Sequence, residues 1–160
     1  MKKRRIKPGL SLRKNMTRIV SRMLRDVMAS LEVVVAHPAR EKDLHRARIA
    51  AKPLRYSIEI LEDASGPRCK EYFSEIKDLI RLMGKIHDLD SSRAILTGLL
   101  KEIGDRAAVD AAASRTKELS PIRKMLAKQK RERARLFGKM AARVGRLKAE
   151  AVEKGLLENL

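Results

Sequence analysis

Residues 44–61 of the chain read LHRARIAAKPLRYSIEIL, and this stretch decides the fold. An α-helix turns once in about 3.6 residues, so side chains three and four positions apart fall on one face. Six apolar residues follow that spacing here: Leu44, Ala47, Ala51, Leu54, Ile58 and Leu61. Because two of the six are alanines, the pattern predicts a helix whose apolar face lets neighbouring helices approach closely.

A row of basic side chains lies beside this apolar face. One position after four of the apolar residues come His45, Arg48, Lys52 and Arg55, and Glu59 continues the line. Like charges at this spacing repel each other, so an anion bound along the row would stabilise the helix. The alternative is a charged face that only meets solvent, which is the commoner fate of such a row taken alone.

The composition is typical of an all-α protein of one domain. The chain has 160 residues, rich in Leu, Ala, Arg, Lys and Glu, with only 8 Gly and 5 Pro and no alternating β pattern. Only four residues are aromatic (Tyr56, Tyr72, Phe73 and Phe137), so the core must be mainly aliphatic. The single Cys69 excludes an internal disulfide and fits a reducing compartment. No apolar run approaches the ~20 residues that span a bilayer, so the sequence predicts a cytoplasmic protein without membrane association.

The expected fold is an up-down four-helix bundle with one broken helix and a short extra helix. A mobile basic arm (1–10) precedes a single domain (11–155). The helices are expected over 11–36, 43–63, 68–83 with an interruption at 84–90 and a continuation to 104, 105–119, and 120–154. Ser11, Asp43 and Asp90 are candidate N-caps, and Ser120-Pro121 reads as a helix start. Pro53 is expected to kink the central helix.

The net charge of +18 is concentrated in two segments. Residues 1–40 hold 11 basic and 2 acidic residues, and residues 120–148 hold 11 and 1. Such asymmetry favours a polyanionic partner, because concentrated like charge otherwise only destabilises the folded state. Each segment has its own row at helical spacing: Lys14, Arg18, Arg22 and Arg25 in the first, and Lys124, Lys128, Arg131 and Arg135 in the second. We expect these rows and the His45 row to face one shared cleft.

Two sequence landmarks resemble those of a known family. The pattern His45-x-x-Arg48-Ile49-x-x-Lys52-x-Leu54-Arg55-Tyr56-x-x-Glu59 is similar to the signature of the CHAD family, the conserved histidine α-helical domain. Residues 82–90, LMGKIHDLD, are similar to the family's second landmark. The two occur in the family's order and together cover about residues 43–100. At Pro53 the chain departs from the pattern, where the family usually has Lys or Arg, so one cation is missing.

The resemblance implies an all-α fold that binds inorganic polyphosphate, associates with polyphosphate granules and has no catalytic activity. Full modules of the family usually hold two four-helix units, so this half-length chain is expected to form a homodimer. The predicted polyphosphate-binding residues are His45, Arg48, Lys52, Arg55, Arg18, Arg22, Arg25, Lys124, Lys128, Arg131 and Arg135. Guanidinium groups fork onto phosphate oxygens, ammonium groups act as point charges, and an imidazole can donate a hydrogen bond.

Nucleic-acid binding and enzymatic activity are the two alternatives to polyphosphate binding. Nonspecific binding of RNA or DNA is the alternative, because a net charge of +18 attracts any polyanion. Against it, few aromatic residues are available for stacking on bases. For an enzyme, His87, Asp88 and Asp90 are the only compact acid and base candidates, and they read better as structural residues. We therefore expect no catalytic residue, no metal and no cofactor.

Overall fold

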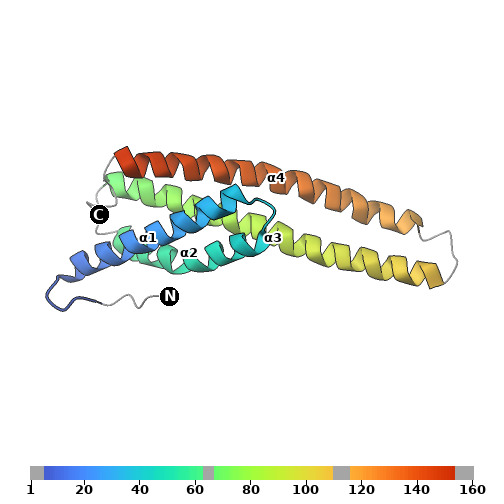
Figure 1. Ribbon diagram of the computed structural model, residues 1–160, viewed down its shortest axis with the longest axis horizontal. Helices are drawn as coiled ribbons and strands as arrows, with labels where there is room; N and C mark the ends of the chain where they lie inside the picture. Colours follow the sequence, from blue (N-terminus) through green and yellow to red (C-terminus); the bar gives the residue numbers. More distant parts are fainter. Residues whose placement is uncertain (1–5, 63–66, 110–115, 154–160) are drawn as a thin grey trace.

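The computed structural model describes residues 6–62, 67–109 and 116–153. They form four helices: α1 (Leu12–Ala36), α2 (Glu41–Glu62), α3 (Pro67–Val109) and α4 (Thr116–Glu153). No strand occurs in these three ranges. Successive helices run up and down beside one another (Figure 1), which confirms the all-α class.

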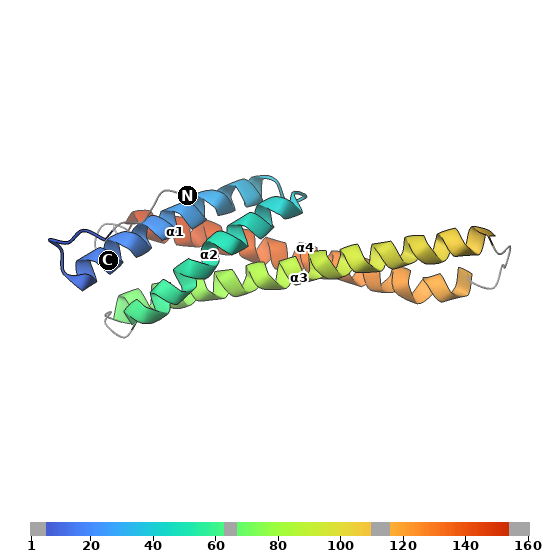
Figure 2. The ribbon, with the colours of Figure 1, turned by 90° about the horizontal axis from the view of Figure 1, so that it is seen from below.

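The molecule has two regions. In the first, α1 packs on α2, α2 on α3, α3 on α4, and α4 less extensively on α1. We call this four-helix region the bundle. Beyond it, the end of α3 and the beginning of α4 continue as a two-helix hairpin that neither α1 nor α2 reaches (Figures 1 and 2). We call this hairpin, residues 95–109 and 116–131, the arm.

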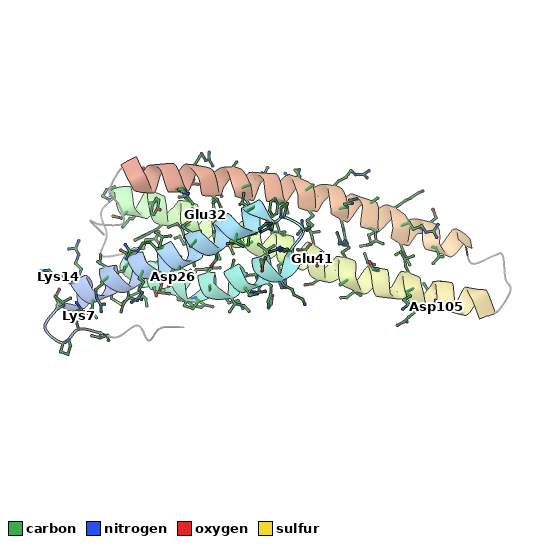
Figure 3. All side chains as sticks on the ribbon, viewed as in Figure 1. Lys7, Lys14, Asp26, Glu32, Glu41 and Asp105 are labelled. Atoms are coloured by element: carbon green, nitrogen blue, oxygen red, sulfur yellow. The ribbon has the colours of Figure 1, made fainter. Side chains whose placement is uncertain are left out.

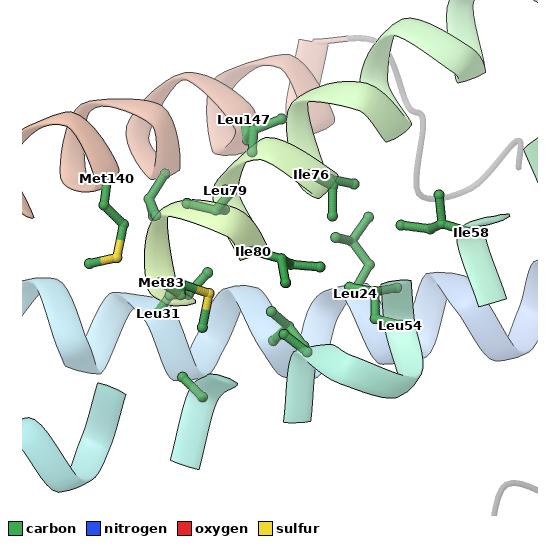
Figure 4. Packing of buried hydrophobic residues seen from close by; sticks show 14 of the residues in the cluster. Leu24, Leu31, Leu54, Ile58, Ile76, Leu79, Ile80, Met83, Met140 and Leu147 are labelled. Atoms are coloured by element: carbon green, nitrogen blue, oxygen red, sulfur yellow. The ribbon is translucent and has the colours of Figure 1, made fainter. Parts of the chain in front are cut away.

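The core lies in the bundle and is mainly aliphatic, as predicted. All six apolar residues of the 44–61 pattern are buried, at 8% exposure or less. They pack against side chains from the other three helices (Figure 4), among them Leu24, Leu31, Ile76, Met83, Met140 and Leu147. The apolar periodicity of α2 therefore gave the correct buried face, because four helices around one core need a narrow apolar stripe from each.

The expected break at residues 84–90 is wrong. α3 runs without interruption for 43 residues, and both Gly84 and Asp90 lie in its interior. Asp90 is buried and pairs with Arg133 of α4, so it does not cap a helix. The separate short helix is also wrong for the described residues, since 105–109 end α3 and 116–119 begin α4. The remaining part of that segment, 110–115, lies outside the described residues.

Two of the prolines lie inside helices rather than at their ends. Pro53 lies inside α2, which continues on both sides of it. Pro121 lies inside α4, which begins five residues earlier at Thr116, so the expected start at Ser120 is wrong. Each proline is exposed, which leaves room for its ring on the solvent side of the helix.

The segment before α1 is bound to that helix. Ser11 caps α1 as predicted, its hydroxyl accepting from the Lys14 backbone N at 3.3 Å. Asn15 is 3% exposed; its Oδ1 accepts from the Lys7 backbone N at 2.8 Å, and its Nδ2 donates to the carbonyls of Lys7 and Leu10 at 2.9 and 3.1 Å. Lys7 and Leu10 are therefore hydrogen-bonded to α1, and the mobility expected for residues 1–10 stays a prediction. Residues 1–5 of that expected arm lie outside the described residues.

Candidate functional site

The basic row of α2 lies along the side of α2 that borders α3. At one end of this side, His45 Nδ1 is 2.7 Å from His87 Nε2 of α3. At the other end, Lys77 Nζ of α3 donates to the Glu62 carboxylate at 2.7 and 2.8 Å. Helical spacing puts Arg48, Lys52 and Arg55 between these two contacts. Arg48 is half-buried there, whereas Lys52 and Arg55 are exposed.

His45 and His87 form a hydrogen-bonded imidazole pair. Their ring centroids are 4.9 Å apart and their planes are tilted by 31°. The other nitrogen of His87, Nδ1, lies 3.3 Å from the Ser91 hydroxyl. One imidazole must donate and the other accept, so the pair shares a proton between two helices.

An open cavity of about 440 Å³ adjoins this pair. Its lining comes from the first turns of α2 and the middle of α3: Glu41, Lys42, His45, Arg46, His87, Asp90, Ser91 and Ala94. Arg93 pairs with Glu41 at 3.3 Å, and Arg133 neutralises Asp90. With both carboxylates paired, the remaining lining is basic or neutral.

Two cations of α3 extend the basic surface away from α2. Arg81 and Lys85 line a second hollow of about 160 Å³, with Asp78, Leu82 and Arg143 of α4. Arg143 pairs with Glu75 at 3.0 Å and with Asp78 at 3.5 Å, which fixes this side of α3 against α4. Arg81 pairs with Asp78, one turn earlier on its own helix.

The basic row of α4 meets the same side of α3. Arg135 holds the Glu132 carboxylate in two hydrogen bonds of 2.6 and 2.7 Å. The pKa of Glu132 is lowered, first by this hydrogen bond and then by the charges of Arg135, Lys139 and Lys85. Arg135 and Lys139 precede Arg143 by eight and four positions, about two turns and one turn, so they lie near the side of α4 on which Arg143 pairs with α3. Lys124, Lys128 and Arg131 continue this row along the arm, and all three are exposed.

Together these residues form one cationic surface that follows the outer side of α3. Across the bundle it runs from α2 over α3 to α4. We call this surface the cationic belt and define it by Arg48, Lys52, Arg55, Arg81, Lys85, Arg135 and Lys139. Glu59, Asp78 and Glu132 partly neutralise it, through pairs with Arg55, Arg81 and Arg135.

The basic row of α1 lies on a different face. Lys148 of α4 pairs with Glu32 at 2.8 Å, so this side of α1 borders α4 (Figure 3). Arg25 and Arg18 precede Glu32 by seven and fourteen positions, which are two and four turns, and share its side. The side of α1 that borders α2 is marked instead by Met23, whose Sδ is 3.8 Å from the Ser57 hydroxyl.

The structure therefore does not gather the three rows into one cleft. Packing in the order α1, α2, α3, α4 puts the α1–α4 side and the α2–α3 side on opposite sides of the bundle. Arg18, Arg22 and Arg25 are thus separated from Arg48, Lys52 and Arg55 by the core. Helical periodicity groups cations on one face of a helix, but it does not say which helix borders that face.

His87, Asp88 and Asp90, the candidate acid–base group, each contact another side chain. Asp90 is held in a buried pair, and Asp88, with a side chain 75% exposed, is 3.9 Å from His87 Nδ1. Within the described ranges, no three His, Cys, Asp or Glu side chains are grouped as a metal site would require. None of the described helices has the length and apolar character to cross a membrane.

Sequence reasoning did not single out three residues of this region. Arg81 and Lys85 belong to the cationic belt, and Arg133 anchors Asp90. The segment around Arg81 and Lys85 is balanced in charge, so a count of charges passes over it. The contact of His87 with His45 had one signal in the sequence: both histidines stand in the two family-like landmarks.

Comparison with known families supports the sequence landmarks. The family model described as CHAD domain matches residues 3–97, which include α1, α2 and α3 as far as Thr97. The match contains the His45 row and the His87 segment, while α4 lies outside it. A search of curated proteins and a search of solved structures each gave no match. Since the matched region is more than half of the chain, the protein belongs to the CHAD domain family.

Proposed function

We propose that the protein binds inorganic polyphosphate along the cationic belt, without catalysing a reaction of it. The observation that carries this proposal is the continuity of basic side chains over three helices on the outer side of α3. Membership of the CHAD domain family supports it, since this domain is known in polyphosphate-related proteins.

The chemistry of the belt suits a chain of phosphates. Successive cations on a helix face are spaced by about 5–6 Å, a distance that a flexible polyanion can follow. Arg48, Arg55, Arg81 and Arg135 can each present two N–H groups to one phosphate, and Lys52, Lys85 and Lys139 add point charges. Glu59 and Glu132 pair with Arg55 and Arg135, and phosphate oxygens can replace these carboxylates as acceptors of the guanidinium N–H groups.

Nucleic acid is the second candidate, and the same belt would meet its backbone. A single-strand binder usually stacks bases on exposed aromatic rings. Of the four aromatic residues in the chain, only Tyr56 is exposed, at 62%, while Tyr72 and Phe73 are buried and Phe137 is half-buried. This distribution favours a ligand without bases.

Two further expectations remain predictions. One is association with polyphosphate granules. The other is a homodimer, for which the outer side of α2 is the surface to test, because Ile49, Tyr56 and Ile60 are 52–68% exposed there. Sedimentation of the wild type and of Ile60→Asp at several concentrations checks the dimer. Equal, monomeric behaviour of both proteins would exclude this interface.

The decisive experiment is a titration with labelled polyphosphate at about 150 mM salt, near physiological ionic strength. The variant Arg48→Glu/Lys52→Glu/Arg55→Glu should bind roughly tenfold more weakly or worse, since three phosphate contacts become repulsive. The matched control, Lys101→Glu/Arg123→Glu/Lys130→Glu, reverses the same number of charges at exposed positions of the arm outside the belt. Its affinity for polyphosphate should fall threefold or less.

Competition separates the two ligand classes. Unlabelled polyphosphate should displace the labelled chain at a lower phosphate concentration than duplex DNA or single-stranded RNA does. A tenfold preference for either nucleic acid would overturn the proposal. So would a belt variant that keeps its affinity within twofold, or a control variant that loses as much as the belt variant. Circular dichroism confirms that each variant is folded.

A further inference from the structure

The α1 face is a second cationic surface that the proposed function leaves unused. We define the α1 face by Lys14, Arg18, Arg22 and Arg25. Lys14, Arg22 and Arg25 are exposed, and Arg18 is half-buried with Nη2 3.5 Å from Asn15 Oδ1. Two carboxylates lie near this row: Glu32 at its far end is paired with Lys148, and Asp26, four positions after Arg22, is exposed, so the face keeps an excess of positive charge.

Buried Asn15 organises one end of this face. The same Oδ1 atom that receives Arg18 also accepts the Lys7 backbone N at 2.8 Å. Lys7 is therefore held next to the first turns of α1, and Lys7 and Lys14 lie at the same end of the molecule (Figure 3). Fixed backbone and a partly fixed guanidinium make this end of the row more ordered than a set of free surface lysines.

The α1 face and the cationic belt point away from each other. Two layers of helices separate them, and helices are about 10–12 Å in diameter. The separation is thus on the order of 20 Å, more than twice the Debye length of about 8 Å at physiological ionic strength. A polyanion bound to one face scarcely repels a polyanion bound to the other.

We propose that the protein cross-links polyphosphate, holding one chain on the cationic belt and a second chain on the α1 face. The inference rests on the proposed function and adds a second, independent binding surface to it. One protein then joins two chains, and because each long chain binds many proteins, a network forms. Such avidity needs no contact between protein molecules.

The test is a bridging assay with two differently marked polyphosphates. Biotinylated short chains are immobilised, protein is bound, and fluorescent short chains are then added and washed. The wild type should retain the fluorescent chain on the immobilised one. The variant Lys14→Glu/Arg22→Glu/Arg25→Glu should bind the first chain within about threefold of wild type and retain at least tenfold less of the second. Half-buried Arg18 is left unchanged to protect the fold.

The arm variant Lys101→Glu/Arg123→Glu/Lys130→Glu is again the matched control and should bridge like the wild type. Equal bridging by the α1 variant and the wild type would overturn the inference, because bridging would then come from another surface or from protein dimers. Binding of the first chain with no capture of the second by the wild type would also overturn it. In both cases the proposed function stands. Failure of the wild type to bind the first chain would contradict the proposed function itself.

Discussion

The bundle and the arm share α3 and α4, yet they bury very different amounts of apolar surface. In the bundle, Phe73, Leu31 and Met83 have no exposed surface. In the arm, Ile95 is 72% exposed and Met125 is 50% exposed. A pair of helices covers only one side of each partner, whereas four helices enclose a core. We infer that the stability of the protein resides in the bundle, and that the arm is ordered because α3 and α4 extend into it.

A buried ion pair marks the boundary between the two regions. Asp90 of α3 and Arg133 of α4 pair with side-chain exposures of 8% and 14%. Arg133 Nη2 also donates to the Pro38 carbonyl at 3.1 Å, where the connection between α1 and α2 closes the bundle. Beyond this point Gln129 Nε2 donates to the Ser92 hydroxyl at 2.8 Å. At the end of the bundle, α3 and α4 are thus joined by the Asp90–Arg133 pair and the Ser92–Gln129 hydrogen bond.

The largest expected effect is the difference in unfolding free energy lost when a large apolar side chain is replaced by alanine in the bundle and in the arm. Phe73→Ala should lower the free energy of unfolding by about 3–5 kcal/mol, because it opens a cavity in the core. Leu99→Ala in the arm, where the side chain is 42% exposed, should cost about 1 kcal/mol or less. Urea unfolding followed by circular dichroism measures both. Similar losses would mean that the arm carries as much of the stability as the bundle.

The boundary pair gives the next largest effect. Asp90→Ala leaves the Arg133 charge buried without its carboxylate and should cost about 3 kcal/mol. Asp88→Ala, two residues away with a side chain 75% exposed, should change stability by about 0.5 kcal/mol or less. Thermal unfolding of the two variants makes the comparison. If Asp90→Ala were as mild as its control, the pair would not hold bundle and arm together.

The sequence predicted the bundle better than the arm, for a physical reason. The apolar periodicity of residues 44–61 depends only on the turn of the helix, so the buried face of α2 was predicted residue by residue. The continuity of α3 through Gly84 and Asp90 was not predicted, because the partner of Asp90, Arg133, lies 43 positions later and cannot be identified from spacing. Without that partner, Asp90 reads as a helix cap and Gly84 as a break.

The same reasoning applies to the basic residues that the sequence predicted as a polyphosphate site. Each basic row was predicted as a row because its members share a helix face. Their distribution over two sides of the bundle follows from which helices are neighbours, as fixed by contacts such as His45 with His87 and Glu32 with Lys148. These contacts join residues that are far apart in the sequence. A single chain without related sequences offers no direct signal for them.

A glycine in the arm gives a smaller effect that tests whether the arm unfolds separately. Gly98 lies in α3, and a Cβ added there would meet nothing within 4 Å. Gly98→Ala should therefore stabilise the helix by about 0.5–1 kcal/mol, because glycine has more backbone freedom to lose. Hydrogen exchange should show greater protection of amides in the arm and little change in the bundle. Equal gains in both regions would show that they unfold as one unit.

The smallest effect concerns an exposed ion pair one residue from the buried one. The hydrogen bond from Arg135 lowers the pKa of Glu132 below its usual value of 4.5. Since this pKa is lower in the folded than in the unfolded state, the stabilisation is present above about pH 4.5 and is lost as the pH falls through the folded value. The pair is exposed, so its contribution to stability is small.

Carboxyl NMR titration isolates this pair. In Arg135→Gln the pKa of Glu132 should rise towards 4.5, and Lys139→Gln, which removes a weaker charge effect, should raise it less. An unchanged pKa in Arg135→Gln would contradict the hydrogen bond. Bound polyphosphate should also raise this pKa, because its phosphates compete with Glu132 for Arg135.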